Sequence, residues 1–240
     1  MAKIIHYEGK LPKRIGDCVV YPLNGQLIVR AKSGFTTKAL KTSVKYAQCR
    51  SNAHEFGRVS RLCKVMRQAL WGILPRQHNL VVVNGLTKKM RALLDLDGVN
   101  AVGERNLAVA FAQVEAQQAF EGYAFNPMTA LDVQYTMTNT QVSGAITAVP
   151  YTENATHLGW RVHALAFDFA APAHQLTSGD WQYTALAAPN WEFAVERPMV
   201  GDGTGVVLTL LEVALYAQAK DGYAPCADGS KTVLVVGVGR

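Results

Sequence analysis

The sequence predicts an α+β protein that is mostly β, in which a basic region of a β-hairpin and helices (residues 1–121) precedes a β-sandwich domain (residues 122–240). Three observations predict this arrangement. An Asn-Gly pair lies between two strand-like runs near the start of the chain, and a long segment with helical periodicity follows it. After Gly122, strand-like runs rich in Val, Thr, Tyr and Phe recur with turn residues between them.

The first predicted element is a β-hairpin within residues 16–34. The runs "VVYPL" and "QLIV" flank Asn24-Gly25, a pair suited to a type I′ turn because that turn needs positive φ at both central residues. Pro22 has no N–H group to donate to a sheet, so its strand is expected to lie at an edge.

A basic helix is predicted over residues 42–70, either continuous or broken near Ser51-Asn52. Gly72 and Pro75 end it. Its apolar residues recur at spacings of three and four positions, which is typical of a helix with one buried face. This stripe consists of Phe56, Val59, Cys63, Met66 and Leu70.

The segment that follows has a mixed pattern. "NLVVVNG" (residues 79–85) predicts a short strand and turn, after which Thr87 would cap a short helix, "KKMRALLDLDG". Residues 104–120 are rich in Ala and fit a helix, but the alternation in "NLAVAFAQV" favours a strand.

The region after Gly122 predicts a sandwich of about seven short strands. No linker rich in Ser, Gly or Pro precedes it, so the two regions are expected to pack on each other. The strand-like runs are "ALDVQYTM", "GAITAVPY", "HLGWRVHALAFDF", "WQYTALAA", "GVVLTLLEVALYAQA" and "KTVLVVGV".

The two halves of the chain differ in charge. Residues 1–100 hold 18 Lys and Arg against 5 acidic residues, whereas residues 101–240 hold 6 against 13. This asymmetry indicates either a polyanionic partner or a second copy that binds head to tail; the alternative is neutralisation within one molecule. The cations assigned to such an interface or polyanion-binding site are Arg30, Lys32, Lys38, Lys41, Lys45, Arg50, Arg58, Arg61, Lys64 and Arg67.

Motifs for catalysis or metal binding are missing from the sequence. The four cysteines have no C-x-x-C spacing, and His157 and His163 would share a strand face without a third metal ligand nearby. Asp95-Leu-Asp-Gly98 could open a Ca²⁺ loop, but Asn106 stands where an EF-hand needs Glu, so a turn at a helix end is predicted. We therefore expect no enzyme, no metal and no cofactor, and no small-molecule substrate is identified.

The N-terminal sequence "MAKIIHYEGKLPKRIGD" lacks the apolar run of a signal peptide. No stretch of about 18 apolar residues predicts a membrane span. A cytoplasmic protein without a membrane partner is expected.

The order of these features resembles a family of uncharacterised bacterial proteins. The resemblance rests on "GKLPKRIGDCVVYPLNGQLIVRAKSG", "SNAHEFGRVSRLCKVMRQAL", "GERNL", "EGYAFN", "NATHLGWRVHALAFDF" and "VVLTLLEVALYAQAKDGY", and this sequence departs from the pattern by inserting "VEAQQA". It implies a basic hairpin-plus-helix region joined to an immunoglobulin-like β-sandwich, with no known activity and no catalytic residue.

Three function classes follow. The first is a self-assembling structural protein, a homopolymer (filament, tube or shell) built through contacts between the basic and acidic halves, with the strand of Pro22 or "TVLVVGV" pairing across subunits. The alternative is a nucleic-acid-binding protein whose basic half contacts phosphates, with Tyr46 available for stacking. The third is ligand or carbohydrate binding by the sandwich through Trp160, Trp181 and Trp191.

Overall fold

The computed structural model describes residues 2–4, 12–32, 36–74, 79–127, 131–201, 205–226 and 230–239. The chain divides into two compact units, Met1–Arg50 (unit 1) and Ser51–Arg240 (unit 2). The division falls inside the helix α2 (Ala47–Ala69).

Unit 1 contains an antiparallel sheet whose described strands have the order β1-β4-β3-β2. The predicted hairpin is confirmed, because β3 pairs with β4 and the turn residues Asn24 and Gly25 have φ angles of 50° and 74°. At Pro22, β4 is the only described strand that pairs with β3, because β2 pairs with β3 only at Cys18 and Val19. The strands are β1 (Ala2–Ile4), β2 (Arg14–Ile15), β3 (Cys18–Leu23) and β4 (Gln26–Ala31).

The helical segment that follows is interrupted earlier than the sequence predicts. α1 (Thr37–Thr42) begins at Thr36, whose hydroxyl accepts a hydrogen bond from the Ala39 N–H, and a 3₁₀ turn, η1 (Val44–Tyr46), precedes α2. The break lies at Ser43, whose backbone is extended. The Ser43 N–H donates a hydrogen bond to the Ala39 carbonyl, and α1 ends there. α2 then continues without a break through residues 51 and 52.

Residues 79–85 form a helix rather than the predicted strand and turn. α3 (Asn79–Leu93) buries Val82, Leu86 and Met90, and these spacings of four place them on one helix face. Thr87 is not a cap: its hydroxyl donates to the Val83 carbonyl inside α3.

The strand favoured for residues 104–120 is also wrong. This segment forms α4 (Leu107–Ala110), capped by the Asn106 side chain, and α5 (Val114–Phe120). Leu107, Phe111 and Phe120 of this segment are buried in the core that the helices share with the large sheet. The alternating apolar residues therefore do not indicate a strand here. A 3₁₀ turn, η2 (Leu94–Leu96), joins α3 to the loop before α4.

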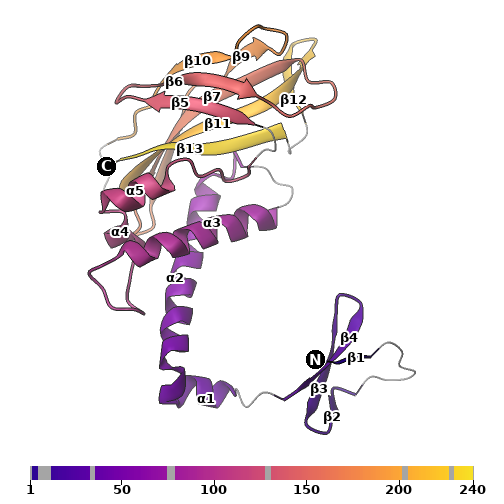
Figure 1. Cartoon of the computed structure of the whole chain (residues 1–240). Helices are drawn as coiled ribbons and strands as arrows, with labels where there is room; N and C mark the ends of the chain where they lie inside the picture. Colours follow the sequence, from indigo (N-terminus) through magenta and orange to yellow (C-terminus); the bar gives the residue numbers. More distant parts are fainter. Residues whose placement is uncertain are drawn as a thin grey trace. The chain divides into compact units, whose positions relative to one another are not determined.

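The predicted fold class is confirmed: the structure is mostly β, and its C-terminal part is a sandwich of two antiparallel sheets with immunoglobulin-like layering (Figure 1). The small sheet has the order β10-β6-β5, and in the large sheet β11 pairs with β7, β12 and β13 while β7 also pairs with β8 and β9. The small-sheet strands are β5 (Asp132–Met137), β6 (Gln141–Ala148) and β10 (Glu192–Glu196). The large-sheet strands are β7 (His157–Phe167), β8 (His174–Ser178), β9 (Gln182–Ala185), β11 (Val206–Ala219), β12 (Gly222–Pro225) and β13 (Lys231–Gly239).

Unit 2 has two hydrophobic cores, one on each face of the large sheet. Val162 and Val213 lie in the core between the sheets, whereas Leu165 and Leu208 lie in a core shared with Leu70 and other residues of the helices. β7 and β11 are therefore buried on both faces, which explains their nearly continuous apolar sequences.

Gly122, where the sequence predicts the domain boundary, lies within unit 2. The N–H groups of Gly122 and Phe125 donate to the carbonyls of Val235 and Val233, so this segment runs along β13. Because this segment already pairs with β13 at Val233 and Val235, these residues of β13 are not free to pair with a strand of another subunit. No helix in the described ranges is long and apolar enough to cross a membrane.

Candidate assembly interface

Unit 1 is strongly basic, and few of its described side chains are buried. Its fifty residues carry ten Lys and Arg and two acidic residues, a net charge of +8. Among its described residues, only Val20 and Ile28 are buried hydrophobics, whereas Leu23 is 52% exposed and Val44 is 87% exposed. Both charge and apolar surface are thus left facing outward.

The predicted site residues of unit 1 are mostly exposed. Those with exposed side chains are Arg30, Lys32, Lys38, Lys41 and Lys45. Two of them lie over aromatic rings: Arg30 Cζ is 5.7 Å from the centre of the Tyr21 ring, and Lys45 Nζ is 5.9 Å from that of Tyr46. These cation–π contacts hold charge beside an aromatic face.

Arg50 has a structural role inside unit 1. Its Nη1 donates to the carbonyls of Leu40 and Ser43, each at 2.8 Å. The carbonyls at the end of α1 have no partner within that helix, so the guanidinium ties α1 to the start of α2. This residue is less available to a polyanion than the sequence indicates.

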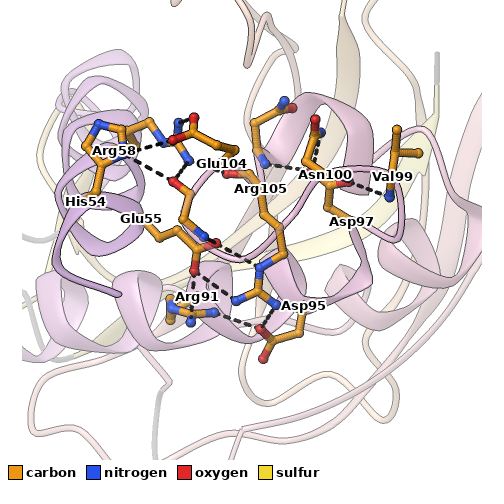
Figure 2. Close-up of polar contacts among 12 residues, drawn as sticks. His54, Glu55, Arg58, Arg91, Asp95, Asp97, Val99, Asn100, Glu104 and Arg105 are labelled. Atoms are coloured by element: carbon orange, nitrogen blue, oxygen red, sulfur yellow. Dashed lines mark hydrogen bonds and ion pairs between the residues drawn. The ribbon is translucent and has the colours of Figure 1, made fainter. Parts of the chain in front are cut away.

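The other four predicted cations lie on the part of α2 that belongs to unit 2. Arg58 donates to the carbonyls of Gly103 and Arg105 at 2.7 and 2.9 Å and to the Glu104 carboxylate at 3.2 Å (Figure 2). Arg61 and Lys64 are exposed, and Arg67 is half-buried with its Nη1 lacking a hydrogen-bond partner among the described residues. The ten cations therefore divide into six on unit 1 and four on unit 2.

Glu55 is a key residue of this helix that the sequence reasoning missed. Its buried carboxylate accepts hydrogen bonds from Arg105 Nε and Nη2 and from the Gly103 N–H, each at 2.8 Å, and Arg91 Nη2 lies 3.2 Å away (Figure 2). The Arg105 hydrogen bonds lower the pKa of Glu55 to about 2, against the opposing effect of burial.

The signal for Glu55 lies in the helical stripe. The position four residues before Val59 is Glu55, which is buried, whereas Phe56, assigned to the stripe, is 54% exposed. The apolar face thus ends in a buried carboxylate, and a glutamate on a helix stripe is the pattern that predicts a buried ion pair.

Asp97 shapes the loop that carries Gly103 and Arg105. Its carboxylate accepts from the N–H groups of Val99, Asn100 and Asn106 and from the Asn100 side chain, at 2.8 to 3.0 Å. The predicted turn at a helix end is confirmed. Burial alone would raise the pKa of Asp97, but these hydrogen bonds outweigh it and lower the pKa to about 2.

The outer face of the small sheet is acidic. In β10, Phe193 and Val195 are buried, and Glu192 and Glu196 are exposed on the opposite face. Asp132 of β5 is also exposed. β5, β6 and β10 contain no Lys or Arg, so the face defined by these three carboxylates, called the acidic face below, has no cation on its own strands.

A second buried carboxylate lies in the large sheet. Glu212 is 1% exposed and binds Arg161 Nε at 2.7 Å, His163 Nε2 at 2.9 Å and Lys231 Nζ at 3.2 Å. Burial raises the pKa of Glu212, but these partners outweigh it, and the net shift is downward. His157, on the same strand as His163, packs against the Tyr223 ring instead, and no group of three or more metal-ligating side chains occurs in the described residues.

The tryptophans assigned to ligand binding do not form one surface. Trp160 is 4% exposed and lies in the core between the sheets, where its Nε1 donates to Gln182. Trp191 packs partly buried against the same core, and Trp181 stacks with Arg161, whose Cζ is 4.5 Å from the ring centre.

These features define a two-unit α+β protein with a basic first unit, in which few described side chains are buried, and an acidic sheet face in its second. No protein-family model matches the chain, and no curated protein matches it.

Proposed function

We propose that this protein is a self-assembling structural protein whose copies polymerise head to tail, with unit 1 of one copy bound to the acidic face of the next. The observation that carries the proposal is the combination in unit 1 of a net charge of +8 with two buried hydrophobic side chains among its described residues.

A unit of fifty residues with only two buried hydrophobic side chains among those described would gain stability from association. Below about 40 to 70 residues, domains rarely bury enough apolar surface for independent stability, and natural ones rely on disulfides, metals or association. The four cysteines of the chain are free thiols. Association with another copy would cover the exposed apolar residues of unit 1.

Charge favours the acidic face as the partner surface. Asp132, Glu192 and Glu196 are exposed on strands that carry no cation, and Lys38 and Lys41 are exposed on α1. Complementary patches of this kind steer association and set its orientation. Because the two surfaces differ, the contact is heterologous, and such contacts give open polymers when they do not close into a ring.

A charge-swap experiment tests the contact between copies. One variant carries Lys38→Glu and Lys41→Glu, and a second carries Glu192→Lys and Glu196→Lys. We expect wild-type protein to show large particles by light scattering at low salt, and fewer as salt screens the charges. Each variant alone loses assembly, and an equimolar mixture regains it, because the reversed unit 1 of one matches the reversed face of the other.

A double variant with Lys88→Glu and Lys220→Glu is the matched control, since both lysines are exposed in unit 2. It should assemble like the wild type. Wild-type protein that stays monomeric at low salt and high protein concentration would contradict the proposal. So would a mixture that fails to assemble, because charges that neutralise each other within one molecule cannot be rescued by mixing.

Nucleic-acid binding is the second candidate, favoured by the cations that lie over Tyr21 and Tyr46 in unit 1. Phosphate contacts with base stacking would use the same pairs. Fluorescence anisotropy of a labelled single strand across a salt series separates the two functions. Binding that weakens with salt and is lost in the variant with Lys38→Glu and Lys41→Glu, but not in the variant with Glu192→Lys and Glu196→Lys, would favour nucleic acid over assembly.

A further inference from the structure

Unit 2 contains an apolar cavity of about 790 Å³ beside α2 and α4. Its volume lies within the range of about 300 to 1,000 Å³ that small-molecule sites occupy. Its walls come from three segments far apart in the sequence. The apolar side chains that line it include Val59, Leu62 and Val65 of α2, Leu107 and Val109 of α4, and Phe169.

The charged residues that line the cavity in the described part of the chain are arginines: Arg58, Arg61 and Arg105. Arg105 is committed to Glu55 and Asp95 by ion pairs. Arg58 uses its terminal nitrogens on Glu104 and two backbone carbonyls, but its buried Nε has no hydrogen-bond partner among the described residues.

Arg61 is the cation available to a ligand. It is exposed, and no hydrogen bond or ion pair joins it to another described residue. It lies one turn of α2 after Arg58 and lines the cavity together with the apolar side chains. Among the residues that the structure describes, none that lines this cavity is acidic.

We infer that this cavity binds an amphipathic anion, a carboxylate with a long apolar chain. The apolar chain of the ligand would leave water by lying against Leu62, Val109 and Phe169, and the burial of apolar surface favours binding. The carboxylate would accept charge-assisted hydrogen bonds from Arg61, whose planar guanidinium matches its geometry.

A second copy is the less suitable occupant. Unit 1 is cationic, and the arginines of the cavity would repel it. The inference is therefore independent of the polymer contact, which uses the acidic face.

Isothermal titration calorimetry on the full chain tests the site, with dodecanoate, dodecanol and dodecylammonium as probes below their micelle concentrations. We expect dodecanoate to bind with one site per chain, about tenfold more tightly than dodecanol, since a charge-assisted hydrogen bond contributes at least that factor. Dodecylammonium should bind more weakly than either.

Three variants locate the site. Arg61→Gln should weaken dodecanoate by about tenfold and leave dodecanol unchanged. Lys64→Gln is the matched control, because Lys64 is exposed on the same helix but does not line the cavity, and it should change neither affinity. Val109→Trp fills the cavity and should abolish binding of both probes.

Circular dichroism must show that Val109→Trp is folded; if it is not, Arg61→Gln and Lys64→Gln decide the question alone. The inference is overturned if dodecanoate does not bind, or if Arg61→Gln and Lys64→Gln weaken it equally. It is also overturned if folded Val109→Trp binds normally, or if that variant abolishes self-association instead, since the cavity would then be a contact between copies.

Discussion

Arg105 binds the buried carboxylate of Glu55 through two hydrogen bonds of 2.8 Å, from Nε to Oε1 and from Nη2 to Oε2. The two residues are fifty positions apart in the sequence, so this pair fastens the loop before α4 to the middle of α2. Because Arg105 also lines the apolar cavity, the ion pair supports one wall of that site.

Removing the Glu55 charge should destabilise unit 2. Glu55→Gln leaves Arg105 and Arg91 without their shared carboxylate, and we expect a loss of about 3 kcal/mol, the lower end of the range for a broken buried pair, because both arginines can partly reach water. Glu104→Gln is the control, since Glu104 is 69% exposed and its loss should cost less than about 1 kcal/mol. Urea unfolding measures both, and equal losses would contradict the role of Glu55.

Acid should destabilise unit 2 in a defined pH window. The folded-state pKa values of Glu55 and Asp97 lie at about 2, below their ordinary values of 4.5 and 3.8, so the folded state binds fewer protons than the unfolded state as pH falls. The stability that these groups contribute is fully present above about pH 5 and is lost progressively as pH falls toward 2. Thermal melts across this window should show a steep decline in the wild type and a shallower one in Glu55→Gln. Parallel curves for the two proteins would rule out Glu55 as a source of the acid sensitivity.

The Glu212 cluster should be a second determinant of stability. Glu212→Gln leaves Arg161 and Lys231 without their counter-ion in a sheet that is buried on both sides, and we expect a loss of about 3 kcal/mol. Glu192→Gln, on the exposed acidic face, should change stability by less than about 0.5 kcal/mol. Chemical denaturation of the two variants side by side is the measurement, and a neutral Glu212→Gln would show that the cluster contributes little.

Truncation should distinguish the boundary at residue 50 from the one predicted near residue 122. A fragment of residues 51–240 keeps both hydrophobic cores of the sandwich and should unfold cooperatively. A fragment of residues 122–240 loses the helices that cover Phe167, Leu208 and Val235, and it should aggregate or bind a hydrophobic dye. A well-folded 122–240 fragment would show instead that the sandwich is stable without the helices.

Local patterns predicted the elements whose geometry depends on neighbouring residues. Asn24-Gly25 predicted a type I′ hairpin because its two positive φ angles are a property of the turn itself. The stripe of Val59, Cys63 and Met66 predicted a buried helix face by spacing alone. The strand β10, by contrast, was not among the predicted strand-like runs, although its residues alternate between buried and exposed.

Residues 79–93 show where local patterns fail. The β-branched run of Val81, Val82 and Val83 favours a strand locally, yet the segment is helical because Val82, Leu86 and Met90 enter a core shared with α2 and the large sheet. Burial against distant elements outweighed propensity, which amounts to only a few tenths of a kcal/mol per residue.

The charge of unit 1, its hairpin turn and the sandwich strands β5, β6, β7, β9, β11 and β13 were predictable from the sequence, because charge is a matter of composition and turns and many strands follow from adjacent residues. The strands β8, β10 and β12 were not predicted. The contact between Glu55 and Arg105, the helices α4 and α5, and the position of Arg58 and Arg61 beside an apolar cavity became visible in the three-dimensional structure alone. These three features depend on contacts between residues far apart in the chain, and the pattern of neighbouring residues does not indicate which distant surfaces will pack together.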